Sequence, residues 1–598
     1  MTVPLEDIAM IGDGETVALV TRQGSVDWLC LPRFDSPACC ASLLGNPEHG
    51  CWSIAPEEPI ESSEHRYQPG TMVLETDLTS ASGTIRITDF MPIRSGNPVL
   101  VRMVTGLEGR VKARMDASLR FDYGNMPPWV TEFDGGVLLH VGPDKVVLRS
   151  SEKLEITDSK VVSRFTVSEG DSHVFVLTYG SAQDPAPEAV DPDKSLKETQ
   201  QYWRDWIGRF ESPCENDDYS AALRRSLLTL KALVHRPTGG LVAAPTTSLP
   251  EQPGGKMNWD YRFCWLRDAT FTLSALVDCG YTQEASAWRD WILRAVAGAP
   301  DKMQIMYRVD GSRRLNEAEL PWLPGYRFAR PVRVGNAAAG QLQLDVYGEL
   351  IRVLHASEQA GMDRTEQGRH LEHAIVDYVE RMWVEPDSGL WESRGEPRHY
   401  TYSKAMTWVA LDRFLGGKGG QELKRADRER IEALRDKIHA VICKEGYDAG
   451  LGSFTSYFGG QEVDASLLLL PKVGFLPADD ERMRGTIALI EERLVDDGLV
   501  RRHLMPALVP EGAFIACSFW LAECQLMQGR RSAAVETIER ALSIRSDVGL
   551  LSEEYDVASR RLTGNYPQAL SHLALVNALV ALAKYEREGE AALAADRS

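Results

Sequence analysis

Three segments of the sequence combine aromatic residues, carboxylates and arginines in a way that is unusual for loops: 259–268, 389–395 and 551–556. A sugar site needs this mixture. Aromatic faces cover the apolar C–H side of a pyranose ring, and Asp and Arg bind its hydroxyl groups. Each segment alone is also compatible with a helix cap and surface aromatics, since Asp268 precedes an expected helix. Three such segments in one chain favour a carbohydrate site.

Two of these segments contain carboxyl groups that could cleave a glycosidic bond. That reaction needs one protonated carboxyl for the leaving oxygen and one ionised carboxyl for water or direct attack. Spacing alone does not choose among the candidates, which are Glu392, Glu396, Glu553, Glu554 and Asp556.

The composition fits a large enzyme of ordinary globular type. A chain of 598 residues exceeds what one core supports, so we expect at least two domains. The net charge of −20 disfavours nucleic acid and anionic membranes as partners and suits a neutral substrate. A homo-oligomer is compatible with this composition.

The sequence also bears on the cellular compartment and on whether a metal site is expected. The first eight residues have neither a basic nor an apolar region typical of a secretory signal, and no run of about 18 apolar residues predicts a membrane span. The ten cysteines lie mostly in apolar runs and form no CxxC pair, so we expect reduced thiols and no metal site. These features predict a cytoplasmic protein.

The first part of the chain alternates between apolar and polar residues. Segments 84–88, 111–115 and 172–177 follow this period of two, and turn residues separate them. The pattern predicts an antiparallel β-sandwich over residues 1–185. No Gly-rich phosphate loop follows a strand, which leaves a nucleotide site without support.

A proline- and acid-rich stretch, 184–193, marks the expected domain boundary, and a linker with a connector helix is predicted over residues 186–212. From there to residue 590 the period is 3.6. Twelve helical runs are predicted near 217–235, 265–280, 283–299, 340–358, 364–383, 401–416, 423–445, 462–470, 480–493, 512–528, 531–545 and 567–588.

These runs differ in polarity. The last is apolar nearly all round, whereas 423–445 is charged on one face. Buried helices that alternate with amphipathic ones indicate an inner ring inside an outer ring, an (α/α)₆ barrel. A superhelical solenoid is the alternative, but the sequence has no fixed repeat to support it.

At these motifs the sequence resembles glycoside hydrolase family 15, which includes glucoamylases, glucodextranases and bacterial trehalases. The segment 11–37 resembles the N-terminal domain of bacterial trehalase-like members. The other matching motifs are WDYRFCWLRDA (259–269), RHYTYSKAMTW (398–408), EEYD (553–556) and TGNYPQALSHLALVNA (563–578). The resemblance implies a multidomain fold, a β-sandwich followed by an (α/α)₆ barrel.

The resemblance also assigns roles. It implies that Glu392 is the general acid and Glu553 the general base, with Glu554 as the second choice for the base. The substrate-binding residues that it predicts are Trp259, Tyr261, Arg267, Asp268, Leu390, Trp391, Arg502 and Tyr555. Arg308, Arg501 and His503 depart from the family pattern and leave open what the leaving-group subsite accepts.

The family mechanism is inverting and requires neither a metal nor an organic cofactor. We expect a neutral glucoside as the substrate, first of all trehalose, because the chain lacks a signal peptide and a starch-binding module and has the trehalase-like N-terminal segment. Short α-1,4 or α-1,6 glucosides are the alternative. A disaccharide phosphorylase is a rival that would not need Glu553, and a sugar-binding protein would need neither glutamate.

Overall fold

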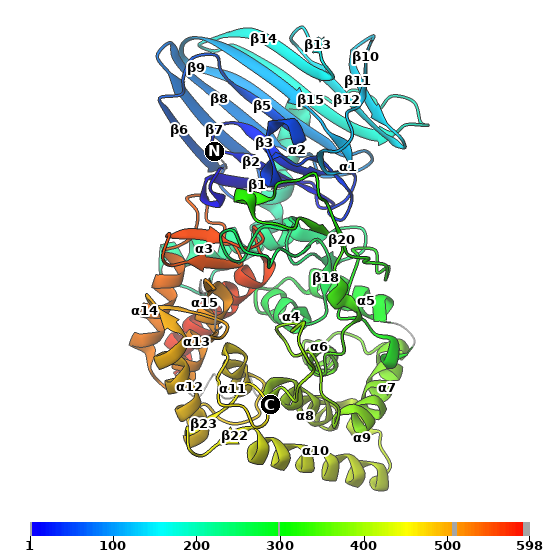
Figure 1. Cartoon of the computed structure of the whole chain (residues 1–598), viewed down its shortest axis with the longest axis vertical. Helices are drawn as coiled ribbons and strands as arrows, with labels where there is room; N and C mark the ends of the chain where they lie inside the picture. The colour runs from blue at the N-terminus through cyan, green and yellow to red at the C-terminus, as the bar shows by residue number, and fades with distance from the viewer. Residues whose placement is uncertain (1–2, 297–298, 505–510, 590–598) are drawn as a thin grey trace.

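The computed structural model describes residues 3–296, 299–504 and 511–589. Its N-terminal part consists of strands that all pair antiparallel (Figure 1), as the alternating pattern predicts. One group of strands contains β1 (Ile8–Gly12), β2 (Val17–Thr21), β3 (Ser25–Cys30), β4 (Ala38–Cys40), β5 (Cys51–Pro56), β13 (Glu155–Thr157) and β14 (Lys160–Ser168). The other contains β6 (Ser62–Tyr67), β7 (Leu74–Ser80), β8 (Gly83–Phe90), β10 (Trp129–Phe133), β11 (Gly136–Val141), β12 (Asp144–Ser150) and β15 (Ser172–Ser181).

The 20-residue strand β9 (Val99–Ser118) joins the two groups. Its first half pairs with β8 and β15, and its second half pairs with β5 and β14. Glycines allow the close approach where the strand changes partners: a Cβ atom on Gly106 would lie 2.1 Å from the Ser168 carbonyl oxygen, and one on Gly109 would lie 2.3 Å from that of Ser82. Any other residue would force these backbones apart.

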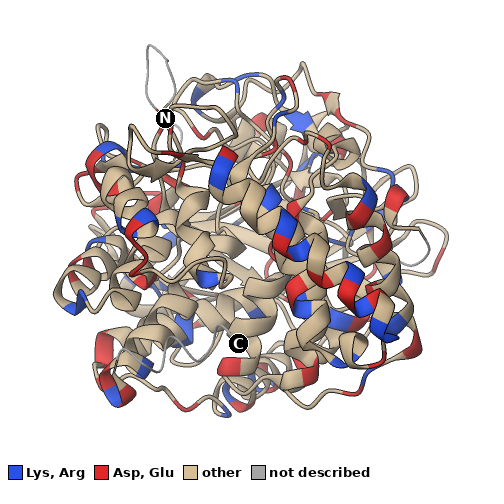
Figure 2. Cartoon of the chain, turned by 90° about the horizontal axis from the view of Figure 1, so that it is seen from below, with Lys and Arg blue, Asp and Glu red and all other residues tan. Residues whose placement is uncertain are grey.

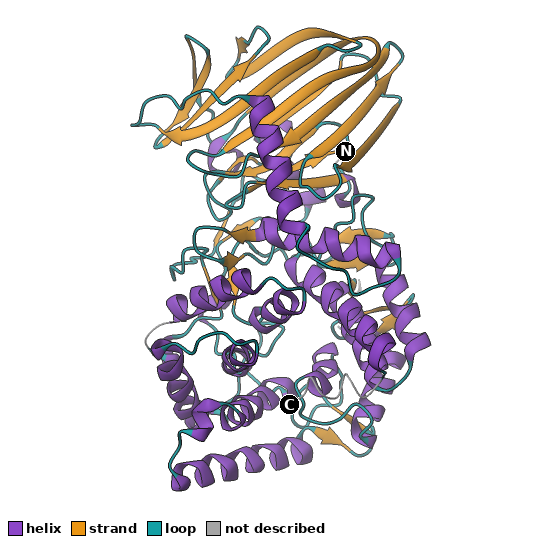
Figure 3. Ribbon diagram, turned by 180° about the vertical axis from the view of Figure 1, so that it is seen from behind, coloured by secondary structure: helices purple, strands orange, loops and turns teal. Residues whose placement is uncertain are grey.

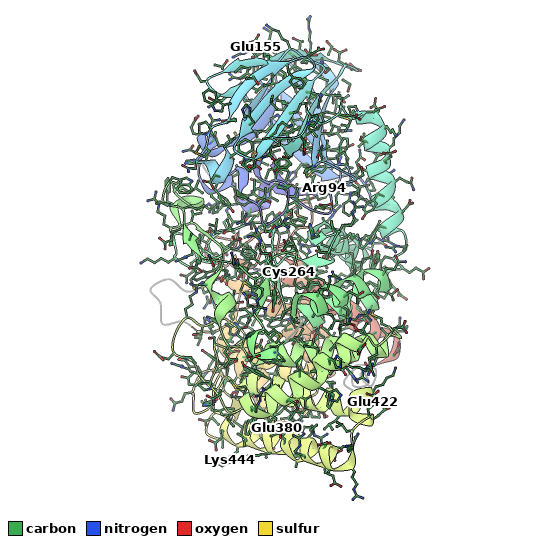
Figure 4. All side chains as sticks on the ribbon, turned by 90° about the vertical axis from the view of Figure 1, so that its right-hand side faces the viewer. Arg94, Glu155, Cys264, Glu380, Glu422 and Lys444 are labelled. Carbon is green, nitrogen blue, oxygen red and sulfur yellow. The ribbon has the colours of Figure 1, made fainter. Side chains whose placement is uncertain are left out.

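Helix α2 (Pro192–Ile207) follows the last long strand and leads to the helical part of the chain (Figure 3). Its N-cap Asp191 accepts a hydrogen bond from the backbone N–H of Lys194, and the helix buries Trp203 and Trp206. Figure 4 labels Arg94 near the level where strands and helices meet. The Arg236 guanidinium donates to the Arg94 carbonyl oxygen there.

Helices at all twelve predicted places make up the C-terminal part of the described chain. They are α3 (Asp217–Leu233), α4 (Ala269–Asp278), α5 (Thr282–Val296), α6 (Asp345–Gln359), α7 (Glu366–Met382), α8 (Thr401–Gly416), α10 (Arg425–Glu445), α11 (Leu469–Lys472), α12 (Glu481–Leu494), α13 (Ile515–Met527), α14 (Arg531–Leu542) and α15 (Ala569–Glu588). A 3₁₀ turn, η7 (Ala465–Leu468), precedes α11, and the short helices α1 (Phe121–Gly124) and α9 (Lys418–Gln421) lie outside this set.

Six of these helices form a closed inner ring. Contacts run from α4 to α6, α8, α11, α13 and α15 in turn, and α15 contacts α4 again. Figure 1 shows α3, α5, α7, α10, α12 and α14 outside them. This arrangement is the predicted (α/α)₆ barrel. Burial explains the two rings, because α13 is buried along nearly its whole length whereas α10 buries only Ile431, Ile438 and Ile442.

Three helices begin later than the hydrophobic period predicts, and one of them, α11, begins at Leu469 rather than near 462, after the turn η7. The run near 265–280 becomes a helix only at Ala269, because Cys264 and Trp265 pair with Met306 and Tyr307 as strands. Likewise α6 begins at Asp345 rather than near 340. For α4 and α6, residues before the helix are used by the site described below.

The loops contain further short strands: β16 (Val234–His235), β17 (Gly240–Leu241), β18 (Cys264–Trp265), β19 (Met306–Tyr307), β20 (Ala318–Glu319), β21 (Arg333–Val334), β22 (Tyr447–Asp448), β23 (Ser453–Phe454), β24 (Val495–Asp496), β25 (Leu499–Val500), β26 (Ala513–Phe514), β27 (Glu554–Asp556) and β28 (Arg561–Thr563). Acidic and basic residues are interspersed over the helices seen from below (Figure 2). None of the described helices is long and apolar enough to cross a lipid bilayer.

Candidate active site

A cavity of about 700 Å³ lies at the end of the barrel where the inner helices begin. Its volume is in the usual range for a small-molecule site. The lining residues come from the segments that precede the inner helices. They include Glu251, Trp259, Tyr261, Arg267, Arg333, Asn336, Trp391, Glu392, Arg394, Tyr400, Tyr457, Glu462, Asp464, Arg502, His503, Phe514 and Glu553. The structure therefore brings both predicted catalytic glutamates into one cavity.

In the extended segment 259–262, alternate side chains point to the cavity and to the protein interior. Trp259 and Tyr261 line the cavity, whereas Asp260 and Arg262 are buried and pair with each other at 2.7 Å. Arg262 also donates to the Ser36 carbonyl oxygen, at 2.8 Å, in the N-terminal part of the chain. The loop between β3 and β4 thus supports the cavity wall from behind.

Glu553 is held by two donors at the cavity wall. Its Oε1 accepts a hydrogen bond from the Tyr261 hydroxyl at 2.6 Å, and its Oε2 lies 3.4 Å from the backbone N–H of Asn565. Gly564 makes room for this carboxyl, since a Cβ atom there would lie 2.6 Å from Oε2. Burial raises the pKa of Glu553, and the charge of Glu251 raises it further. Arg502 and the Tyr261 hydrogen bond oppose this rise, because they stabilise the ionised form.

Glu392 has a different set of partners. Its Oε1 accepts from the Trp265 indole at 2.6 Å and from the Arg267 guanidinium at 3.2 Å. Burial raises the pKa of Glu392, and the charge of Arg267 opposes the rise. The backbone of Glu392 has φ of +56°, a left-handed conformation that is strained for a glutamate. Gln341 donates to the Glu392 carbonyl oxygen at 3.2 Å and helps to hold this turn.

Not every predicted sugar-binding residue lines the cavity. Asp268 and Leu390 lie behind Arg267, whose Nε donates to Asp268 at 2.8 Å and whose Nη1 donates to the Leu390 carbonyl oxygen at 3.3 Å. Tyr555 lies on β27 with its ring 5.7 Å from the Arg540 guanidinium. The described cavity lining contains none of these three, so this geometry gives no support to direct sugar contact by Tyr555.

Arg502 connects the cavity to a buried acidic cluster. Its guanidinium pairs with Glu251 and Glu511 and lies 3.3 Å from Glu554. Oxygens of these three carboxyl groups lie within 4.8 Å of one another, close enough for a metal site, but the Arg502 cation already contacts all three. Glu554 is fully buried and does not line the described cavity, which favours Glu553 as the reacting member of the pair.

The three residues that depart from the family pattern lie in different places. Arg308 pairs with Asp35 at 2.7 Å and supports the contact with the N-terminal strands instead of lining the cavity. Arg501 pairs with Asp496, also outside the cavity. Only His503 lines it, and burial lowers the His503 pKa to about 4, with a further contribution from the charge of Arg502. A neutral imidazole therefore faces the cavity at neutral pH.

The sequence interpretation assigned no role to several cavity residues, although Arg394 lies within the marked segment 389–395. Arg394 and Arg333 lie 3.9 and 4.6 Å from the centre of the Trp259 ring. Glu251 stands outside the three marked segments, and its only signal is a carboxylate shortly before the WDYRF motif. Their contacts depend on loops that are distant in sequence, so composition alone does not reveal them.

A strip of aromatics, the Arg267–Asp268 pair, the buried Glu553 and the partly exposed Glu392 lie at the mouth of an (α/α)₆ barrel, an arrangement that fits a glycoside hydrolase. The sequence model described as glycosyl hydrolases family 15 matches residues 217–580, and a trehalase-like N-terminal model matches residues 1–203. The chain belongs to glycoside hydrolase family 15.

Curated relatives extend over almost the whole chain. It is 36% identical to the trehalase of Mycobacterium tuberculosis over 631 aligned residues, which cover 98% of this chain and 91% of that one. It is 33% identical to the trehalase of Thermoplasma volcanium, with 95% and 91% covered. A bacterial glucoamylase solved in complex with acarbose has the same fold, with a TM-score of 0.71 at 12% identity over 98% of this chain and 94% of that one.

Proposed function

We propose that this protein is an α,α-trehalase that hydrolyses trehalose to two molecules of glucose with inversion at the attacked carbon. One structural observation carries the chemistry: Glu392 and Glu553 line the same cavity with different hydrogen-bond partners. The choice of trehalose is supported by the trehalases that align over nearly the full length, including the N-terminal part.

In this proposal Glu392 donates its proton to the glycosidic oxygen. Arg267 and Trp265 orient the group. Burial raises the pKa of Glu392 and also that of Glu553, the latter to about 8, so the assignment of the two roles follows the family resemblance and not the pKa values. Glu553 accepts a proton from a water molecule, whose oxygen then bonds to the anomeric carbon as the bond from that carbon to the leaving oxygen breaks. The inverting mechanism requires the two carboxyl groups to stand roughly 6.5–9.5 Å apart.

The other parts of the proposal concern the binding of the sugar and the setting of the enzyme. Trp259, Trp391 and Arg502 would contact the glucose rings, with Asp268 and Leu390 acting through Arg267. No metal or organic cofactor takes part, and the enzyme acts in the cytoplasm on a small neutral sugar. The domain limits that we propose are 1–185, 186–212 and 213–590.

The initial products test the proposal. Trehalose joins two α-configured glucose units through both anomeric carbons. Inversion therefore releases the attacked unit as β-glucose, while its partner keeps its own C–O bond and leaves as α-glucose. NMR before mutarotation should show equal amounts of the two anomers. Products that are all α would contradict the roles of Glu392 and Glu553.

A substrate panel separates the alternatives. We expect glucose release from trehalose to exceed that from maltose, isomaltose and dextrin. Preference for maltose or isomaltose would instead indicate a glucoamylase-type or glucodextranase-type exo-glucosidase with the same two glutamates. Formation of glucose 1-phosphate, with no turnover in the absence of phosphate, would indicate a phosphorylase.

A further inference from the structure

A second cavity, of about 620 Å³, lies inside the ring of inner helices and away from the catalytic loops. All six inner helices contribute to it: Thr270 of α4, Arg352 of α6, Arg413 of α8, Lys472 of α11, Glu523 of α13 and Asn577 of α15. Most of the lining residues belong to the C-terminal halves of these helices, whereas the catalytic cavity is lined by segments that precede them. The two cavities therefore lie at opposite ends of the barrel.

Among the charged residues that line the second cavity, cations outnumber acids, although Lys472 and Glu523 pair with each other at 2.6 Å. Its charged residues are Arg352, Arg413, Lys472, Lys584 and Arg587 on the positive side and Glu211, Asp278 and Glu523 on the negative side. This excess of positive charge stands out in a chain with a net charge of −20. A basic cavity in an acidic protein concentrates small anions from solution.

Acids outside the cavity hold two of these arginines in place. Arg352 donates to Glu349 at 3.2 Å and Arg413 donates to Asp412 at 2.6 Å, and neither acid lines the described cavity. The arginine side chains remain 14% and 13% exposed. Each guanidinium has five N–H donors in a fixed fork, so an arginine anchored from behind can still bind an anion in front.

The two arginines also lie close enough to repel each other. Burial lowers the pKa of Arg413, the charge of Asp412 opposes this shift, and the charge of Arg352 adds to it. The neighbouring His355 has a lowered pKa for similar reasons, burial first and then the charge of Arg413. An anion between these groups would relieve the repulsion. Asn577, 8% exposed on the wall of the same cavity, adds an amide whose Nδ2 has no hydrogen-bond partner among the described residues.

The partial negative charge at helix C-termini explains only some of the cations that line this cavity. Cations are favourable in the last turn of a helix, where carbonyl groups lack partners. Arg413 and Lys472 lie in such positions on α8 and α11. Arg352 lies in the middle of α6 (Asp345–Gln359), where the helix dipole does not favour a cation. Its pair with the buried Glu349 balances the charge of Arg352 there, and the same side chain lines the cavity, where its other N–H groups can donate to an anion.

We propose that this cavity binds a small multiply charged anion, either a phosphate compound or a di- or tricarboxylate, through Arg352 and Arg413. The ligand bridges inner helices α6 and α8 at the end opposite the catalytic glutamates. The site is independent of the sugar cavity and of which disaccharide the enzyme prefers.

The test is binding to the full-length protein, measured by isothermal titration and by the thermal midpoint. The probes are inorganic phosphate, glycerol 3-phosphate and citrate, with sodium chloride at matched ionic strength as the reference. We expect saturable binding with one site per chain and a raised midpoint. Tighter binding of the phosphate compounds would identify a phosphate site, and tighter binding of citrate a carboxylate site. Either result supports the proposal.

Variants locate the site. Arg352→Gln and Arg413→Gln should each weaken binding about tenfold or more, the loss expected for a charge-assisted hydrogen bond. Arg352→Lys, which keeps the charge and protects Glu349 from being left unpaired, should retain part of the affinity. The control Arg425→Gln removes an exposed arginine of α10 and should bind like the parent protein.

Three results would overturn the proposal. One is the absence of saturable binding by all three probes in a protein that is folded and active. Another is unchanged binding in both Gln variants. The third is loss of binding when glucose saturates the catalytic cavity, because the anion would then occupy the sugar site.

Discussion

The two ends of the barrel differ in charge and in how their side chains are satisfied. The inner helices all run in the same direction, so their N-termini lie at the catalytic end and their C-termini at the other. Helix N-termini carry partial positive charge and favour anions, and C-termini favour cations. The carboxyl groups of Glu392 and Glu553 lie at the first end, and Arg413 and Lys472 lie at the second. Because the inner helices run in one direction, these carboxyl groups lie at one end of the barrel and these cations at the other.

The two ends of the barrel also differ in backbone strain and in how their buried charges are paired. At the catalytic end Glu392 has a left-handed backbone, and Glu553 and Glu554 are both buried carboxylates with raised pKa values. At the other end Arg364 is matched by Glu358 at 3.0 Å and by Glu372 and Glu422. Backbone strain and buried carboxyl groups with raised pKa values cost stability, and they lie where the chemistry is expected. Substitutions at the two ends should therefore affect different properties.

The largest effect is expected from the catalytic pair. Glu392→Gln and Glu553→Gln should each lower kcat by about 10²–10⁴-fold, because each removes one proton-transfer group. The thermal midpoint should not fall, since each change removes a buried carboxyl with a raised pKa. Steady-state kinetics and circular dichroism on the same samples check this.

Glu554→Gln is the matched control for this pair. The residue is adjacent and equally buried, but it faces Arg502 and not the described cavity. Its kcat should fall far less than that of Glu553→Gln. A dead Glu554→Gln enzyme beside an active Glu553→Gln enzyme would show that the base has been assigned to the wrong glutamate.

The opposite end should respond in stability instead. Arg364→Met leaves Glu358 and Glu372 without their buried partner, a change that costs about 3–5 kcal/mol of unfolding free energy. Urea unfolding should show this loss while kcat stays the same. Arg425→Met is the control, because Arg425 is 92% exposed and its pair with Glu429 should contribute under about 0.5 kcal/mol. A large fall in kcat for Arg364→Met would mean that the two ends are coupled.

A smaller catalytic effect is expected at Tyr261. Tyr261→Phe removes the 2.6 Å hydrogen bond to Glu553 and keeps the ring. A hydrogen bond to a charged group contributes about 1.5–3 kcal/mol, so kcat should fall roughly 10–150-fold with little change in KM. A change confined to KM would indicate that the hydroxyl binds the sugar and does not orient the base.

The sequence predicted the fold well because hydrophobic periods are local. The alternation in 84–88 and 172–177 became β8 and β15, and the 3.6 period located all twelve helices. Helix starts were less accurate at α4, α6 and α11. At α4 and α6, residues with helical spacing are used by strand β18 and by the cavity wall, and tertiary contacts outweigh the local preference.

The sequence predicted those cavity residues that lie together in one short motif, but not the contacts between distant loops. Trp259, Tyr261 and Arg267 share one segment, and all three line the cavity. Arg502 was expected to bind sugar, but its partners Glu251 and Glu511 come from loops on either side of it in sequence. Arg308 was expected near the leaving group and instead pairs with Asp35. Such pairings depend on which loops meet in space, and no local pattern encodes them.

The acidic cluster around Arg502 leads to the smallest predicted effect, a shift of the pH profile. Glu251 raises the pKa of Glu553 by its charge, and Arg502 lowers it. Glu251→Gln removes the negative neighbour and frees Arg502 from one of its partners, and both changes lower the Glu553 pKa. The base must be ionised, so activity is lost as the pH falls through this pKa. The acid limb of the kcat/KM profile should therefore move to lower pH in Glu251→Gln, with the plateau changed only a few-fold. Glu429→Gln, which removes an equal charge from the exposed face of α10, should leave the limb in place. Movement of the limb to higher pH in Glu251→Gln would show that Glu251 acts mainly by holding Arg502 near Glu553 and not through its own charge.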